Sequence, residues 1–420
     1  MITLTKAKGS GGEIKAEPED FLVKEITSSG IVLEPGRKYL PEDLGEKPAE
    51  EGEFTTFVLE KKNWDTINAI LSIAKKVGRG RKSISYAGVK DKRSISVQLA
   101  CVYGVPPSSI NSVNIKDISI NGAWKSSGIS LGSNLGNRFS IAIKNTRDTA
   151  SISSVISESN GFFPNYFDRQ RFGYRLNNFR IGMHILRNEM EEAVLAFLTE
   201  SANETDPESR EARARLARDQ DFQEALEYFP KHLRLERTMI AYLARYRNFP
   251  NAIRSMQRGI SIMFIHSVED AIFNAVLEHR LSEGNLYTGI NCGKNFYGFP
   301  DISSISTADT LAFQTDSLVG YETKDEHISE YSKEIMEKLG ITKESFKIKS
   351  LPELSMKGAY RAILSPFRDF SYLVLEDGAS VKTEFSIPSG SYATIFMNEI
   401  MKNEPYSISE MLREPALSIS

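Results

Sequence analysis

The segment around Asp91 places a single acid between basic residues, a combination suited to acid–base or nucleophilic chemistry. Lys90 precedes this acid, Lys92 and Arg93 follow it, and Gly88 lies three positions upstream. Neighbouring positive charge favours the ionised carboxylate. A glycine can adopt backbone angles closed to other residues, which allows a sharp turn and close approach to a ligand. The segment thus predicts a carboxylate poised to meet an anionic chain; the alternative is a solvated hairpin turn with a surface charge cluster.

A second segment, Asn165–Gly173, alternates aromatic residues with Arg169 and Arg171. Aromatic rings and guanidinium planes can stack on nucleic-acid bases, and the same arginines can contact phosphates. The alternative is the edge of a core in which Tyr166 and Phe172 are simply buried.

Two further segments belong to the same set. Phe385–Thr394 reads as a strand that ends in a Pro-Ser-Gly turn and leads into a helix, with Ser389 or Ser391 as its cap. Amide groups at a helix start favour anions, although a purely structural turn explains the segment equally well. In Ile14–Glu25, Lys15 precedes a proline-bearing acidic turn and a strand, which taken alone is an ordinary charged lead-in.

Strands must position these segments. Alternating or continuous apolar residues predict strands at Phe21–Ile26, at Phe54–Lys61, around Ile84 and at Ile95–Tyr103, with an extended segment at Phe139–Ile143. A loop is expected at Val105–Ser109. Strand character returns at Ser371–Leu375 and Val381–Phe385, before a short helix at Thr394–Met401.

One helix is expected between the second and third strands. Asp65 or Thr66 can cap it and Gly78 can end it. Its apolar face is expected to comprise Ile67, Ile70, Leu71 and Ala74.

Helical spacing dominates from about Gly182 to Arg280, and it returns at Glu330–Leu339. Ser201–Ser209 is polar and is expected to be a loop, and Gly284–Gly298 is glycine-rich and irregular. The order strand-rich, helix-rich, strand-rich predicts an α+β protein in which one sheet domain is interrupted by an inserted domain.

The composition is that of a globular protein whose charges are segregated. The chain has 420 residues, 40% of them hydrophobic, and a net charge of -3. Lys75–Arg93 contains eight Lys or Arg residues and one acid, and Lys231–Arg258 contains seven Lys or Arg residues and one acid. Glu42–Glu53 has the opposite balance, with six acids and one Lys. Local basic patches suit a polyanionic partner; ordinary solvated helix faces are the alternative.

Several function classes are disfavoured. Two cysteines, Cys101 and Cys292, cannot frame a disulfide scaffold, and no CxxC pair or His/Cys cluster suggests zinc. The sequence shows neither a signal peptide nor a membrane-spanning apolar run. A soluble, cytoplasmic protein without a metal or membrane partner is expected, and the sequence does not indicate its oligomeric state.

Five stretches, in order along the chain, resemble motifs of the TruD family of tRNA pseudouridine synthases. They are Lys15 with Pro18–Phe21 and Glu25, Ala87–Asp91, Asn137–Phe139, Asn165–Phe167 with Gln170–Gly173, and Pro388–Thr394. The resemblance covers nearly the whole chain and flanks a divergent middle, where the family carries an inserted domain. The length and the helical insert with basic faces resemble the archaeal branch.

The resemblance implies a pseudouridine-synthase-like catalytic domain with a mixed or antiparallel sheet, interrupted by an inserted, mainly helical α/β TRUD domain. The expected catalytic parts are residues 1–182 and 356–420, and the expected insert is 183–355. It further implies isomerisation of a tRNA uridine, typically at position 13, to pseudouridine without a cofactor or metal.

Site residues follow from the same resemblance. Asp91 matches the catalytic aspartate, Lys15 its basic partner, Phe167 the aromatic that stacks on the flipped base, and Asn165 an asparagine that helps hold the site. Asp168 departs from the family, since many relatives have glycine there. The side chains expected to contact tRNA are Lys75, Lys76, Arg79, Arg81, Lys82, Lys90, Lys92, Arg169, Arg171 and Tyr392, with some of the arginines between Arg234 and Arg258.

The sequence leaves the chemical route open. A carboxylate could attack the sugar C1′ or the base C6, or remove the 2′ proton to give a glycal-like intermediate. One competing hypothesis is a retaining glycosidase, in which Glu25 would pair with Asp91 at about 5 to 5.5 Å. Another is a non-catalytic tRNA-binding module, in which Asp91 would be incidental; an Asp91→Asn substitution separates this hypothesis from an enzyme.

Overall fold

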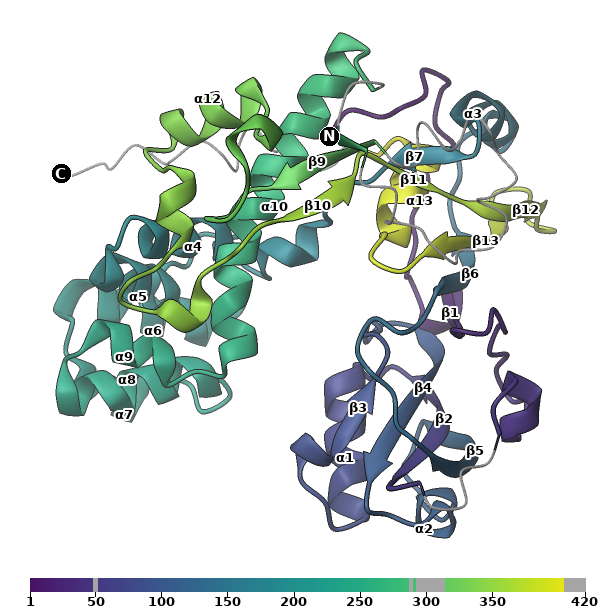
Figure 1. The fold of residues 1–420 in the computed structure, drawn as a ribbon, viewed down its shortest axis with the longest axis horizontal. Coiled ribbons are helices and arrows are strands. Elements are labelled where there is room, and N and C mark those ends of the chain that lie inside the picture. Colours follow the sequence, from purple (N-terminus) through teal and green to yellow (C-terminus); the bar gives the residue numbers. More distant parts are fainter. Residues whose placement is uncertain (48–51, 287–289, 292–313, 404–420) are drawn as a thin grey trace.

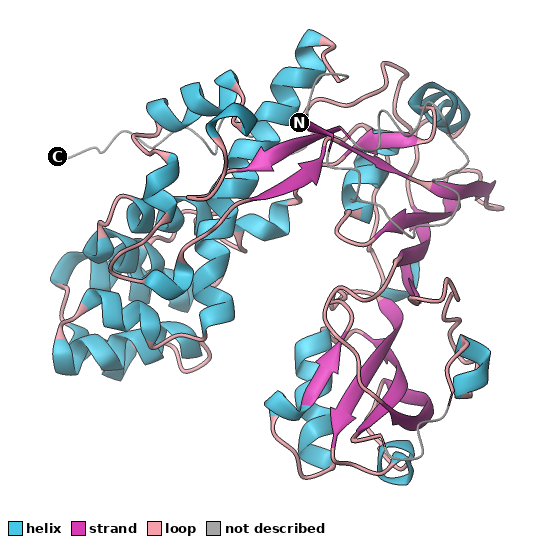
Figure 2. Ribbon diagram, viewed as in Figure 1, coloured by secondary structure: helices cyan, strands magenta, loops and turns pink. Residues whose placement is uncertain are grey.

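The computed structural model describes residues 1–47, 52–286, 290–291 and 314–403. Strands and most helices occupy different parts of the molecule: the large sheet lies on the right of Figure 2, and most helices lie on the left. This is the α+β class expected from the sequence. Cys292 and most of the glycine-rich stretch from Gly284 to Gly298 lie outside the described residues.

A mixed sheet forms the right-hand part, in the order β12-β13-β6-β1-β4-β2-β5, with β3 also paired to β4. β1 runs parallel to β4, whereas β6 runs antiparallel to β1 and β2 antiparallel to β4. In Figure 1, β1 and β6 join the upper strands to the lower ones. The strands are β1 (Phe21–Ile26), β2 (Phe54–Lys62), β3 (Ile84–Tyr86), β4 (Ile95–Tyr103), β5 (Ile118–Ser126), β6 (Gly136–Ile143), β12 (Arg368–Val374) and β13 (Val381–Pro388).

Four helices accompany this sheet: α1 (Thr66–Lys76), α2 (Pro107–Asn111), α3 (Ser151–Ser159) and α13 (Ala393–Met401). α1 begins as expected, because the Asp65 side chain accepts a hydrogen bond from the Asn68 amide. Its buried face differs in part from the expected one. Ile70 and Ala74 are buried with Ala69 and Ile73, whereas Leu71 is 39% exposed. The expected loop at Val105–Ser109 is also wrong in part, since α2 begins at Pro107.

The helical part on the left of Figure 1 is built around α10, whose central residues are buried. Its helices are α4 (Asn178–Leu186), α5 (Met190–Thr199), α6 (Pro207–Asp219), α7 (Phe222–Tyr228), α8 (Arg234–Tyr246), α9 (Phe249–Arg254), α10 (Arg258–Glu283) and α12 (Glu330–Lys338). Among the described helices, α10 alone is long and apolar enough to cross a membrane. However, 78% of its most apolar stretch is buried inside the protein, the position of a core helix.

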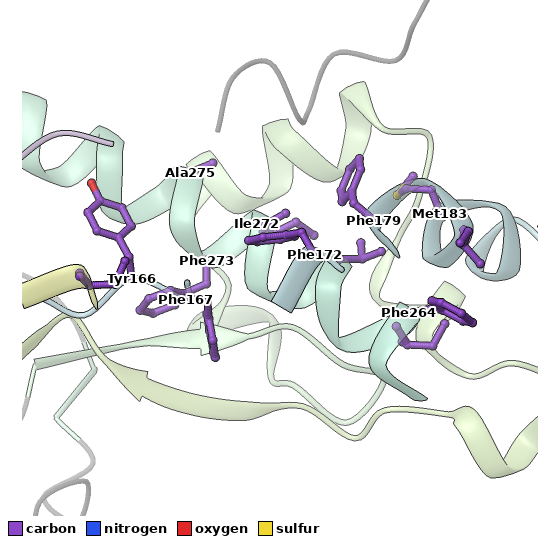
Figure 3. Packing of buried hydrophobic residues seen from close by; sticks show 14 of the residues in the cluster. Tyr166, Phe167, Phe172, Phe179, Met183, Phe264, Ile272, Phe273 and Ala275 are labelled. Atoms are coloured by element: carbon purple, nitrogen blue, oxygen red, sulfur yellow. The ribbon is translucent and has the colours of Figure 1, made fainter. Parts of the chain in front are cut away.

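Two small sheets lie where the helical part meets the large sheet. One pairs β7 (Phe162–Pro164) with β11 (Leu364–Pro366), and the other contains β8 (Ile290–Asn291), β9 (Gln314–Leu318) and β10 (Ala359–Ala362). A continuous apolar core extends through this junction. Figure 3 shows Phe167 beside Phe273 within it. The aromatic segment that follows β7 is therefore held between the two parts.

Candidate active site

Strand pairing brings Lys15 and Asp91 together from distant parts of the chain. Because β1 and β4 are parallel, with Leu22 opposite Ile95, the segments that precede them lie at the same end of the sheet. Lys15 belongs to the first segment and Asp91 to the second. The Lys15 Nζ donates to Asp91 Oδ2 at 2.6 Å, and Nζ lies 4.3 Å from the Phe21 ring centroid. The Asp91 side chain remains 38% exposed, so it is held by a cation and still open to a ligand.

The backbone on either side of Asp91 is anchored by buried polar groups. The Lys61 ammonium, on β2, donates to the carbonyl oxygens of Trp64 at 2.6 Å and Asp91 at 3.1 Å. The Ser94 hydroxyl also donates to the Asp91 carbonyl, at 2.8 Å. Lys61 is fully buried, and this burial lowers its pKa from 10.5 to about 8. These contacts fix the position of the carboxylate through its backbone.

Lys90, next to Asp91, has a different environment from the one expected. Its ammonium is buried and bonds Glu25 Oε2 at 2.9 Å, and Glu25 Oε1 accepts from the Leu99 amide. Lys90 is thus committed to an ion pair in the protein wall rather than exposed for phosphate contact. Glu25 is fully buried in this pair, which removes the partner that a retaining glycosidase would require.

The backbone angle expected for Gly88 was wrong, because Gly88 is not among the residues with positive φ. Gly88 does line the same cavity as Asp91, where the backbone was expected to approach a ligand closely. A Cβ at this position would lie 3.3 Å from Lys90 Nζ and 3.7 Å from Asn134 Oδ1. The Lys90 ammonium would have to shift by a few tenths of an ångström to admit that Cβ.

Asp91 faces a cavity of about 240 Å³, slightly below the ~300–1,000 Å³ range of ligand pockets. Its walls include residues of all five stretches that carry the family resemblance, among them Phe21, Asp91, Asn137, Gln170 and Tyr392. The Asn137 side-chain oxygen is buried and has no hydrogen-bond partner among the described residues. The cavity therefore combines a carboxylate with a free polar acceptor in its wall.

Asn165 and Phe167 do not line this cavity, although Phe167 lies next to Tyr392, which does. Asn165 is buried, and its side-chain oxygen accepts from Arg361 Nη2 at 2.7 Å while its amide donates to the Ala362 carbonyl at 3.0 Å. The Arg361 guanidinium also lies 4.0 Å from the Phe167 ring centroid. Phe167 is only 6% exposed, so a base that stacks on this face must displace Arg361.

Tyr392 lines the cavity, and Asp168 contacts the lining residue Thr394. The Tyr392 and Phe167 centroids are 6.3 Å apart, and burial raises the pKa of Tyr392. Asp168 accepts from the Thr394 hydroxyl at 2.8 Å and from the Arg169 amide at 2.7 Å. Burial raises the pKa of Asp168, and these two hydrogen bonds oppose the rise. Ser389 and Ser391 do not cap α13, whose N-cap is Tyr392.

The basic residues expected to contact RNA divide into exposed and internally bonded groups. The exposed members are Lys75, Lys76, Arg79, Arg81, Lys82, Lys92 and Arg169. Of these, Arg79 also donates to the Gly104 carbonyl and Arg81 to the Gln257 side chain. Arg171 is partly buried and bonds Asp270 at 2.7 Å. In the helical part, Arg254 pairs with Glu353 and Arg237 donates to the Phe229 carbonyl. No group of three or more His, Cys, Asp or Glu residues suited to a metal ion occurs among the residues that the structure describes.

Three residues of this site were missed at the level of sequence. The burial of Lys61 could have been predicted, because side chains alternate along a strand and Lys61 lies on the same inward face as Leu59. Asn137 was noted only as part of a motif, and nothing local marks its side chain as unpaired. Arg361 meets Asn165 across almost two hundred residues, a contact for which local sequence gives no indication.

Comparison with known proteins gives one consistent result. The family model described as tRNA pseudouridine synthase D (TruD) matches residues 2–400. Relatives described as tRNA pseudouridine synthase D are 30% identical in Methanococcoides burtonii (96% of each chain) and 32% identical in Archaeoglobus fulgidus (96% of this chain, 97% of the relative). A crystal structure of TruD from Methanosarcina mazei is similar with a TM-score of 0.71 and 28% identity, covering 96% of this chain and 97% of that one.

Proposed function

The chain belongs to the TruD family of tRNA pseudouridine synthases, and from this premise we propose that it isomerises the uridine at position 13 of tRNA with Asp91 as the catalytic carboxylate. The enzyme is an isomerase that transfers a base within one nucleotide. The observation that carries the assignment of Asp91 is its bond to Lys15 at the wall of the cavity. The cytoplasm, where tRNA matures, is the proposed location.

The reaction breaks the N1–C1′ bond of uridine and forms a C5–C1′ bond, while a hydrogen leaves C5 and N1 gains one. A carboxylate can assist by attacking C1′ or C6, or by removing the 2′ proton. Lys15 acts as a positioning residue, because its charge-assisted hydrogen bond keeps one oxygen of Asp91 in place. The geometry is compatible with each of the three routes.

We assign uracil recognition to Asn137 and to the turn that contains Ser389, all of which line the cavity. The unpaired Asn137 oxygen is a suitable acceptor for the N3–H of uracil. Ser389, Gly390 and Ser391 line the same cavity and supply further polar groups. The target base must leave its stack at a cost of a few kcal/mol, and an aromatic ring returns about 1 to 3 kcal/mol. We assign that ring to Phe167, with Arg361 moving aside to admit the base.

The proposed RNA surface comprises the exposed basic residues of α1 and the turn that follows it, with Arg169 beside the cavity. The proposed domain division is a catalytic domain of residues 1–182 and 356–420 and an insert of residues 183–355. Under this division the cavity belongs mainly to the catalytic domain, and Arg81 contacts Gln257 of the insert.

The direct test uses unmodified tRNA that carries tritium at uracil C5. Because the reaction removes the C5 hydrogen, the purified protein should release tritium to water in an amount equal to the pseudouridine formed. A tRNA with cytidine in place of uridine 13 serves as the substrate control. Binding of tRNA without tritium release would contradict the proposal and favour a binding module.

A further inference from the structure

A second cavity, of about 460 Å³, lies between α1 and Lys92, the residue that follows Asp91. Its lining includes Trp64, Asn68, Leu71, Ser72, Lys75 and Lys92. The volume is within the ~300–1,000 Å³ range of small-ligand sites. An aromatic ring, amide and hydroxyl groups and two cations in one hollow are the groups that bind a nucleotide.

The aromatic wall is already ordered. The Trp64 indole N–H donates to the Lys116 carbonyl at 3.2 Å, and the ring packs against the core beneath α1. Leu71 is 39% exposed at this wall although its neighbours Ile70 and Ile73 are buried. The pocket thus presents apolar surface to solvent, with the ring held in one orientation.

The charges of the pocket favour an anionic ligand. Lys75 and Lys92 are exposed, and neither forms an ion pair within the part of the chain that the structure describes. Asp65, the acid of the pocket, accepts from the Asn68 amide and from its side-chain nitrogen, and the two lysines outnumber its single negative charge. Both cations remain available for a phosphate.

The pocket is coupled to Asp91 through the backbone. Lys92, which lines the pocket, directly follows Asp91, which lines the first cavity. The single ammonium of Lys61 donates to the carbonyls of both Trp64 and Asp91. Because consecutive residues line the two cavities, a strand bound at Asp91 passes close to the second cavity.

From this geometry we propose that the pocket binds the base of a nucleotide adjacent to the target uridine. The base stacks on Trp64 against Leu71, and Lys75 and Lys92 contact the phosphates on either side of it. This inference rests on the proposed function, because it takes the cavity at Asp91 as the site of the target uridine. It adds a contact that orients the strand on entry to the site.

The test compares tRNAs that carry an abasic residue immediately 5′ or 3′ of the target uridine. For the unaltered protein, one of these substitutions should weaken tRNA binding about 5- to 150-fold, the range of one stacked base. In a Trp64→Ala variant the same substitution should change affinity by less than about threefold, because the stacking partner is already missing. Lys324→Ala, which removes an exposed lysine of the helical part, serves as the control and should retain the full abasic effect.

A second measurement reads the pocket directly. The chain contains two tryptophans, Trp64 and Trp124, and Trp124 is buried. In a Trp124→Phe variant, Trp64 becomes the reporter, and tRNA binding should quench its fluorescence less when the relevant base is absent. If Trp64→Ala does not fold, Leu71→Ala replaces it in the affinity comparison, since that side chain is part of the exposed wall.

The inference would be overturned if the abasic substitutions, at both neighbouring positions, changed tRNA affinity equally in the unaltered protein and in Trp64→Ala or Leu71→Ala. A quench that does not depend on either base would also overturn it. Tritium release separates this failure from that of the proposed function: release without coupling rejects the pocket alone, whereas no release by the unaltered protein rejects the function.

Discussion

The buried ammonium of Lys61 should make the free energy of unfolding of the large sheet depend on pH. Replacing Lys61 should remove this pH dependence. Burial lowers the pKa of this group from 10.5 to about 8. The unfolded chain therefore binds the proton more tightly than the folded protein does. Between pH 8 and 10.5 the unfolded state holds more protons, so stability rises with pH; the cost is fully present below about pH 8 and disappears above about 10.5.

The size of this effect follows from the two pKa values. At about 1.36 kcal/mol per pKa unit, the fully protonated group costs about 3 kcal/mol. About 2 kcal/mol of that cost is relieved between roughly pH 7 and pH 9.5, where both states titrate only in part. A Lys61→Met variant lacks this gain. Its absolute stability also reflects the carbonyls of Trp64 and Asp91 that lose their donor, but that loss does not vary with pH.

Urea unfolding at several pH values, followed by tryptophan fluorescence, measures the difference. Both tryptophans pack against the large sheet that contains Lys61, so their fluorescence reports on the unfolding of that sheet. Relative to Lys61→Met, the unaltered protein should gain about 2 kcal/mol between about pH 7 and 9.5. Lys62→Met, which removes the exposed neighbouring lysine, should follow the unaltered protein. Parallel pH curves for the unaltered protein and Lys61→Met would refute the reasoning.

Three further substitutions test the site itself. Lys15→Met should lower the rate of pseudouridine formation about 10- to 150-fold, since the lost bond is worth about 1.5 to 3 kcal/mol. Filter binding should show nearly unchanged tRNA affinity. A larger loss of affinity than of rate would contradict the positioning role. Glu25→Gln should destabilise the protein by about 3 to 5 kcal/mol in urea unfolding, because it leaves the buried Lys90 ammonium without its carboxylate. The double variant with Lys90→Met should recover part of that loss. No recovery in the double variant would argue against the ion pair. Asn137→Ala should raise KM for tRNA about 2- to 12-fold, as expected for one hydrogen bond of about 0.5 to 1.5 kcal/mol, and an unchanged KM would remove Asn137 from uracil recognition.

Local patterns in the sequence predicted local structure well. β1 and β4 have the expected bounds, and α1 is capped by Asp65, because strand alternation and helix capping depend on residues a few positions apart. The family resemblance identified the class of enzyme. The five stretches that carried it also line one cavity, although nothing in their spacing shows that they meet.

Contacts between distant strands were not predictable in the same way. Lys90 was expected on the surface, but its partner Glu25 lies on β1, sixty-five positions away, and a buried pair leaves no local pattern. Gly88 was expected to have an unusual backbone angle, whereas the structure shows an ordinary angle and a close neighbour in space, the Lys90 ammonium. Leu71 fits the expected apolar face of α1 by spacing, yet it is exposed because the core contacts a face rotated toward Ala69 and Ile73.

The most direct measurement of the central claim is tritium release from tRNA by Asp91→Asn beside the unaltered protein, with tRNA affinity measured on the same preparations. Asparagine keeps the shape of the side chain but removes its charge and its nucleophilic oxygen. We expect no detectable release by Asp91→Asn and an affinity within about threefold of the unaltered protein, since phosphate contacts by basic side chains supply a large share of the binding of nucleic acids in general. Release at a comparable rate by Asp91→Asn would contradict the assignment of this carboxylate.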